Sequence, residues 1–208
     1  EVAAERSNLE PSHRTLLRYC NGGKVRIAPL PDLPSPRTGE AAFRPLREGY
    51  SFERESNAMS GRVVVTYHPL YDGRGFSPLT ASWSRYRRAM EQMASLGILD
   101  AIDVQCPPLA DDRDLLRMHS HAHLGAIREG DAAGSGTFAT SDTPAWRGIL
   151  ARARAAVGGT LHAARLVASG DAHHAFNPGG GLHHAMRNEA RGFCPFNDLA
   201  IAADLLAT

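Results

Sequence analysis

The chain has 208 residues, which is enough for one domain with a sizeable hydrophobic core. Its composition, 43% hydrophobic and 22% charged, is typical of a soluble globular protein. The formal net charge of +1 indicates no basic stripe of the kind that nucleic-acid surfaces need, so direct binding of nucleic acid is not expected.

Neither the cysteines nor the apolar runs indicate a secreted or membrane protein. Cys20, Cys106 and Cys194 are far apart and form no C-x-x-C pair, which argues against a disulfide framework and against a zinc ribbon. No apolar run approaches the roughly 18 to 20 residues of a membrane span, and no charged-then-apolar leader opens the chain. We therefore expect a reducing, cytoplasmic setting and no membrane partner.

The first 58 residues differ from the remainder in composition and in hydrophobic pattern. They contain six of the 13 prolines and show little hydrophobic periodicity. We predict that residues 1–58 are a disordered or non-native extension and that residues 59–208 form the folded part. Because the chain begins at Glu1 rather than at a methionine and stops at Thr208 inside a predicted helix, we interpret residues 59–208 as the N-terminal portion of a longer domain.

Strands and helices are predicted to alternate after Met59. Residues 62–66, RVVVT, form a β-branched run that is typical of a strand buried in a parallel sheet. Residues 84–96 carry apolar side chains at spacings of three and four, which predicts an amphipathic helix that stops at Gly97. A second short strand is predicted at residues 101–104. Short strands separated by helices indicate a layered α/β domain.

The second half of the chain is predicted to be mainly helical. Residues 111–112 cap a short helix, and residues 197–198 cap the last one. The sequence Asp-Thr-Pro at residues 142–144 predicts the start of a long helix that runs to about Ser169. The pair Gly158-Gly159 in its middle allows close packing or a bend.

Three histidines, His119, His121 and His123, stand at alternate positions. On a strand all three would lie on one face, where they could hold a metal ion. A helix that begins near His121 would scatter them. We favour this second interpretation, a structural or surface role.

The stretch AFNPGGGLHHAMRNEARGFCPFND, residues 175–198, carries the strongest chemical signal. The glycines at residues 179–181 indicate a backbone that bends sharply or closely approaches a ligand. His183 and His184 can exchange protons near neutral pH. Two histidines beside a glycine-rich turn suit hydrolysis of a carbonyl compound, in which one takes a proton from the attacking water and the other stabilises charge or protonates the leaving group. The alternative is a structural or solvent-facing pair.

The strings GGGLHHA, GFC and FND in this stretch resemble the signature of the histone deacetylase superfamily. The longer AFNPGGGLHHA is most similar to the bacterial acetoin-utilisation branch of that superfamily. Further similar strings, YHP, HSHAHLGAI, SDTP and GGT, occur upstream in the same order. The resemblance covers residues 62–208 and implies a three-layer α/β/α fold of the arginase and deacetylase type, with a mainly parallel sheet that is incomplete in this chain.

The resemblance also implies roles for five residues. His184 would be the general base that acts on water, and His183 would be its electrostatic partner. Gly192 and Phe193 match the wall of a narrow tunnel that grips the stem of an acyl-lysine. Asp142 matches an acidic rim residue that holds the substrate backbone, and helix capping is the alternative role for this residue.

Other positions are implied to be structural or depart from the family. Cys194 matches the family's cysteine beside the tunnel, for which we favour packing over a role as nucleophile. We interpret Asn197 and Asp198 mainly as capping and scaffold residues. Pro195 stands where the family usually has Tyr or Ile, and it removes one backbone donor. The zinc ligands of the family come from a D-x-D-x-H-H-G-D-G motif that this sequence lacks, so we assign no metal ligand here and expect the ligands beyond Thr208.

The implied activity is that of a Zn²⁺- or Fe²⁺-dependent amidohydrolase that removes acetyl groups from acetyl-lysine proteins or from small acetylated amines. Without the metal ligands, the chain by itself is expected to be inactive. Two alternatives stay open from the sequence. One is an arginase-like ureohydrolase with a pair of Mn²⁺ ions. The other is a truncated, non-catalytic relative that serves as a binding or regulatory module.

Overall fold

A computed structural model describes residues 61–72 and 85–208. The predicted extension, residues 1–58, lies outside these ranges. Within them, no helix is both long enough and apolar enough to cross a membrane. The elements in chain order are β1 (Val63–Thr66), the 3₁₀ helix η2 (Pro69–Asp72), α2 (Arg85–Ser95), the 3₁₀ helix η3 (Ile98–Asp100), β2 (Asp103–Gln105), α3 (Asp112–Leu115), α4 (His121–Ala133), α5 (Ile149–Ala168), β3 (His174–Phe176) and α6 (Asp198–Ala207).

The three strands form a parallel sheet in the order β2-β1-β3. Val64 pairs with Asp103 of β2 and with Ala175 of β3, so β1 is the central strand. Residues 64–66 are all buried, because both faces of a central parallel strand are covered. The strand predicted from the β-branched run is therefore confirmed.

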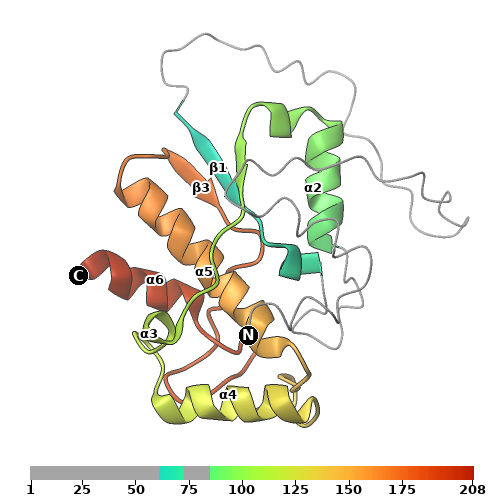
Figure 1. Ribbon diagram of the computed structural model, residues 1–208, viewed down its shortest axis with the longest axis vertical. Coiled ribbons are helices and arrows are strands. Elements are labelled where there is room, and N and C mark those ends of the chain that lie inside the picture. The colour runs from blue at the N-terminus through green and yellow to red at the C-terminus, as the bar shows by residue number, and fades with distance from the viewer. Residues whose placement is uncertain (1–60, 73–84) are drawn as a thin grey trace, which may run out of the picture. The chain divides into compact units, whose positions relative to one another are not determined.

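Helix α5 packs against β1, β3, α4 and α6, and it is the central helix of the described part. Figure 1 shows α5 and α2 on opposite sides of β1. The buried face of α5 supplies many members of the hydrophobic core. This core comprises Ala110, Leu115, Leu124, Ile127, Trp146, Ile149, Ala153, Ala156, Val157, Leu161, Ala190, Phe196, Ile201 and Ala202. The predicted layered α/β class is confirmed for the described residues.

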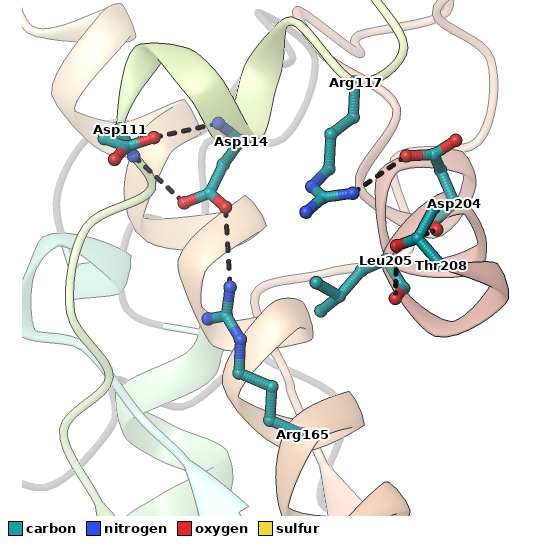
Figure 2. A network of polar contacts seen from close by, with 7 residues as sticks. All are labelled: Asp111, Asp114, Arg117, Arg165, Asp204, Leu205 and Thr208. Carbon is teal, nitrogen blue, oxygen red and sulfur yellow. Dashed lines mark hydrogen bonds and ion pairs between the residues drawn. The ribbon is translucent and has the colours of Figure 1, made fainter.

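Ion pairs tie α3 and the residues just after it to neighbouring helices (Figure 2). Arg165 of α5 places Nη2 3.5 Å from Oδ1 of Asp114. Arg117 places Nη1 3.0 Å from Oδ2 of Asp204 on α6. Asp111 and Asp114 form a reciprocal capping box, which confirms the predicted cap of α3. The ion pairs lie partly in solvent, so each contributes at most about 1 kcal/mol.

The predicted start of the long helix at residues 142–144 is wrong. Helix α5 begins at Ile149, and its N-cap Gly148 has a left-handed backbone with φ of 98°. Oδ1 of Asp131 accepts hydrogen bonds from the amides of Gly148 and Leu150, at 2.6 and 3.2 Å. The cap thus comes from a residue on α4. Pro144 instead takes part in an antiparallel bridge with Thr137.

Two other boundaries differ modestly from the sequence predictions, and one strand was missed. Helix α2 spans Arg85–Ser95, within the predicted residues 84–96. Strand β2 lies at Asp103–Gln105, two residues later than its predicted start. Strand β3 was not predicted, because its short sequence His-Ala-Phe shows no run of buried apolar residues.

Helix α5 approaches the chain before α3 so closely that Gly158 has no room for a side chain. A Cβ atom there would lie 2.0 Å from the carbonyl oxygen of Pro108. We expect Gly158→Ala to lower the free energy of unfolding by about 2–3 kcal/mol, because backbone must move to make room. The matched control is Gly125→Ala in α4, where nothing lies within 4 Å of the added Cβ, and which should stabilise by up to about 1 kcal/mol. Urea unfolding of the three proteins measures both changes, and equal effects at the two sites would contradict the packing argument.

Candidate active site

The glycine-histidine loop is anchored by a buried carboxylate. Asp198, at the start of α6, is fully buried. Its Oδ2 accepts a hydrogen bond from the amide of Gly181 at 3.0 Å, and its Oδ1 accepts one from the amide of Leu182 at 2.6 Å. The hydroxyl of Thr160 on α5 donates to Oδ2 at 2.5 Å. One side chain therefore fixes the loop against α5 and α6.

The glycine triplet is required by close packing within the chain. A Cβ atom at Gly179 would lie 2.5 Å from the ring of Tyr71, and one at Gly180 would lie 2.6 Å from Oδ2 of Asp198. Gly181 has φ of 86°, in the left-handed region that favours glycine. The predicted sharp bend is confirmed. The groups that these glycines approach belong to the chain itself, and a close approach to a ligand stays a prediction.

Asn177 also supports the glycine-histidine loop through hydrogen bonds. Its Oδ1 accepts the amide of Gly179 at 3.1 Å, and its Nδ2 donates to Thr160 Oγ1 and to the carbonyl of Ala156, both at 2.9 Å. Asn177 was not among the residues predicted for the site. Its position in an Asn-Pro dipeptide was the available signal, because such dipeptides favour turns.

The two histidines extend from this loop into solvent. His183 and His184 are both exposed, and their ring centroids lie 4.2 Å apart with a tilt of 38°. Nδ1 of His183 lies 3.0 Å from the carbonyl oxygen of Gly181. Since a carbonyl only accepts, this contact places a proton on Nδ1 and leaves Nε2 of a neutral His183 as an acceptor. The backbone on either side of His184 is held by Asn197, whose Nδ2 donates to the carbonyls of His183 and Ala185 at 3.2 and 3.0 Å.

Gly192 and Phe193 form a tight left-handed turn beside the histidines. Their φ angles are 57° and 65°, and the amide of Cys194 donates to the carbonyl of Arg191 at 2.9 Å. Two consecutive positive φ angles are typical of a type I′ turn. Phe193 is the only non-glycine residue with positive φ in the described part of the chain. A Cβ atom at Gly192 would lie 2.6 Å from Cγ of His184, so the turn packs directly on that imidazole.

Asp142 contacts this turn and remains ionised at neutral pH. Its Oδ1 accepts hydrogen bonds from the hydroxyls of Thr140 and Thr143. The Thr140 hydroxyl is the main cause that lowers the pKa of Asp142, and the amide of Gly192 also contributes. Because α5 begins seven residues after Asp142, at Ile149, the helix-capping alternative for Asp142 is wrong.

The structure thus brings all five predicted site residues into one continuous group. The amide of Phe193 donates to Thr143 Oγ1 at 3.2 Å, which joins the turn to the loop that carries Asp142. Gly192 contacts the ring of His184, and His184 contacts the ring of His183. Their catalytic and substrate-binding roles stay predictions.

Cys194 packs beneath the turn. It is 4% exposed, and burial raises the pKa of its thiol. Its Sγ lies 3.2 Å from the carbonyl oxygen of Gly192. A buried, protonated thiol is a poor nucleophile, so the geometry agrees with a packing role.

The metal interpretation of the three upstream histidines is wrong. Helix α4 begins at His121, whose side chain is exposed, whereas His119 and His123 are buried beside one another. In the two described ranges, no group of three or more His, Cys, Asp or Glu side chains could hold a metal ion. The described residues therefore do not fit a metal site by themselves. Ligands beyond Thr208 stay a prediction.

Comparisons with known proteins agree with the motifs. The histone deacetylase domain matches residues 80–208, more than half of the chain. The acetoin utilization protein AcuC of Bacillus subtilis (strain 168) is 32% identical over 170 residues, which cover 77% of this chain and 37% of AcuC. Histone deacetylase 6 of Arabidopsis thaliana is 30% identical over 167 residues, 74% of this chain and 35% of that protein.

Among solved structures, the HD domain of HDA15 is similar with a TM-score of 0.62 over 71% of this chain and 43% of that one. At 24% sequence identity this likeness shows the fold alone. The chain spans little more than a third of the length of the curated relatives it matches. The matched domain, the two relatives and the shared fold show that this chain belongs to the histone deacetylase family.

Proposed function

We propose that the chain supplies the proton-transfer part of a deacetylase that acts on acetyl-lysine proteins or on small acetylated amines. The observation that carries the proposal is the single group formed by the ionised Asp142, the left-handed turn at residues 192–193 and the exposed pair His183 and His184. Asp198 holds the loop that carries the two histidines in place, as a site that must orient a substrate requires.

In the proposed reaction, the oxygen of a water molecule forms a bond to the acetyl carbonyl carbon, the amide C–N bond breaks, and acetate and a free amine leave. His184 accepts the proton of the water and returns a proton to the amine nitrogen. His183 stabilises the charge that His184 gains. Asp142 accepts hydrogen bonds from the substrate backbone, and Phe193 lines the path of the acyl-lysine stem.

The proposal includes a metal ion, Zn²⁺ or Fe²⁺, in the complete protein. The described residues do not form a metal site, so the ligands would come from sequence beyond Thr208. AcuC and the plant deacetylase, both much longer than this chain, are the basis for that expectation.

The test uses the complete protein and a fluorogenic acetyl-lysine peptide. We expect hydrolysis that a chelator abolishes and that added Zn²⁺ or Fe²⁺ restores. Acetylated polyamines serve as the small-amine substrate. A folded, metal-loaded protein that hydrolyses neither substrate would contradict the proposal and would favour a binding module. Release of urea from arginine with Mn²⁺ would instead indicate a ureohydrolase.

A further inference from the structure

Two buried histidines brace the segment that supports the site. His119 and His123 are 1% and 4% exposed, and their rings stack with centroids 4.8 Å apart. The ring of Phe196 contacts both of them edge-on, at 5.2 and 5.6 Å. The pair forms because Ser120 caps α4 by accepting the amide of His123 at 3.2 Å, which turns the chain so that the two rings meet.

Each imidazole makes a different hydrogen bond to the segment 195–197. Nε2 of His119 accepts the amide of Asn197 at 2.9 Å, so this nitrogen carries no proton. Nε2 of His123 lies 2.8 Å from the carbonyl oxygen of Pro195, which only accepts, so this nitrogen carries one. The partners therefore select opposite tautomers of two neutral rings.

Segment 195–197, which the two buried histidines hold, is hydrogen-bonded to the loop that carries His183 and His184. The side chain of Asn197 donates to the carbonyls of His183 and Ala185, the residues on either side of His184. Ser120, which lies between the two buried histidines in the sequence, also contacts the chain after His184. Its amide donates to the carbonyl of Arg187 at 3.1 Å.

We propose that His119 and His123 are positioning residues for His184, which fix the backbone of residues 183–185 through Asn197. This inference rests on the proposed function only for its effect on catalysis. The contacts of His119 and His123 with segment 195–197, which we call the brace, are a property of the folded chain.

Burial, and for His119 also the positive charge of Arg187, favours neutral rings. Burial is the main cause that lowers the pKa of His119 to about 4, and it also lowers the pKa of His123. Each of the two imidazoles is a titratable neighbour of the other. The guanidinium of Arg187 further lowers the pKa of His119, and Glu129 lines a surface cavity together with His123. Because the pKa of His119 is lower in the folded chain than its ordinary value of 6.5, its contribution to the free energy of unfolding is fully present at pH values above 6.5. This contribution is lost as the pH falls from 6.5 towards about 4.

The first measurement needs no catalysis. Long-range ¹H–¹⁵N spectra of the chain with ¹⁵N-labelled histidine at pH 7 should show one neutral ring protonated on Nδ1 and another protonated on Nε2, assigned by His119→Gln and His123→Gln. The His119 ring should stay neutral at pH 5.5. The same tautomer for both rings at pH 7, or a charged His119 ring at pH 5.5, would overturn the proposal.

The second measurement compares variants at position 119. His119→Leu removes the acceptor, and we expect amide hydrogen exchange in residues 183–197 to rise about tenfold while exchange in α5 stays unchanged. His119→Gln keeps an acceptor oxygen and should restore slow exchange. His121→Leu, on the exposed side of α4, is the matched control and should change nothing. An equal rise in α5 would show general destabilisation and would overturn the proposal.

In the complete metal-loaded enzyme, His119→Leu should lower kcat about tenfold and leave KM within about twofold, because positioning acts on the reacting geometry. His119→Gln should recover most of the activity. Unchanged kcat in the leucine variant would overturn the positioning role. If the unaltered enzyme hydrolyses no acetylated substrate, the proposed function fails, and the tautomer and exchange results still decide whether the brace exists.

Discussion

Replacing His184 by alanine in the complete metal-loaded protein is expected to lower kcat for an acetyl-lysine peptide by about 10²- to 10⁴-fold, the range that general acid–base catalysis contributes. The physical reason is that His184 is the proposed acceptor of the proton of the water. His183 contacts the ring of His184 and engages the carbonyl of Gly181 through Nδ1, and its proposed role is to stabilise charge. Steady-state kinetics at pH 7 measures the loss.

The His184→Ala variant should remain folded, because His184 is exposed and alanine keeps the Cβ atom that packs near Gly192. Its Tm should therefore change by no more than about 2 °C. Substrate binding should also persist, since Asp142 and Phe193 are untouched. His121→Ala is the matched control, an exposed histidine outside the site, and should keep full activity. Full activity in His184→Ala would remove this residue from the mechanism.

The elements predicted correctly are those whose local sequence decides their structure. The valines of β1 are buried on both faces, and no competing local signal stands beside them. The caps of α3 and α6 are also local, because Asp111 binds the amide of Asp114 and Asn197 binds the amide of Ala200. A side chain that bonds three residues ahead can be recognised from the sequence alone.

The elements that were missed depend on contacts distant in sequence. The start of α5 is set by Asp131, 17 residues before Gly148, so the Pro144 signal was misleading. Strand β3 exists because His174 pairs with Val63 of the central strand, which no pattern within three residues could show. Tertiary hydrogen bonds overrode local propensity in both cases.

The site shows the same division. The strings around His183, Gly192 and Asp142 identified residues that the structure brings together, although they come from separate loops. The supporting contacts were not foreseen. The stacking of His119 on His123 was not predicted. The alternating histidines suggested either one face of a strand or side chains dispersed by a helix. These contacts join residues that lie far from the strings in sequence, so a motif does not reveal them.

Asp198 is the contact on which the site loop depends most, so Asp198→Asn should lower the free energy of unfolding of the chain by about 2–3 kcal/mol. The fully buried carboxylate accepts three hydrogen bonds, from the amides of Gly181 and Leu182 and from the hydroxyl of Thr160. An asparagine of the same size offers only one acceptor oxygen and turns an amide group with two donors towards the others. At least one buried donor then loses its partner, and its desolvation is no longer compensated.

Asp204→Asn on the same helix is the matched control. Asp204 pairs with Arg117 at 3.0 Å (Figure 2), but its side chain is 47% exposed, so water replaces the lost contact and the change should stay below about 1 kcal/mol. Urea unfolding at pH 7 compares the two variants, and amide exchange at Gly181 and Leu182 reports the loop directly. Since a small domain has about 5–15 kcal/mol of stability in total, loss of the cooperative transition in Asp198→Asn alone would also agree with the prediction. Equal, small effects of the two substitutions would show that the loop is held by Asn177 and the packing of the glycines, and that the carboxylate at the start of α6 is dispensable.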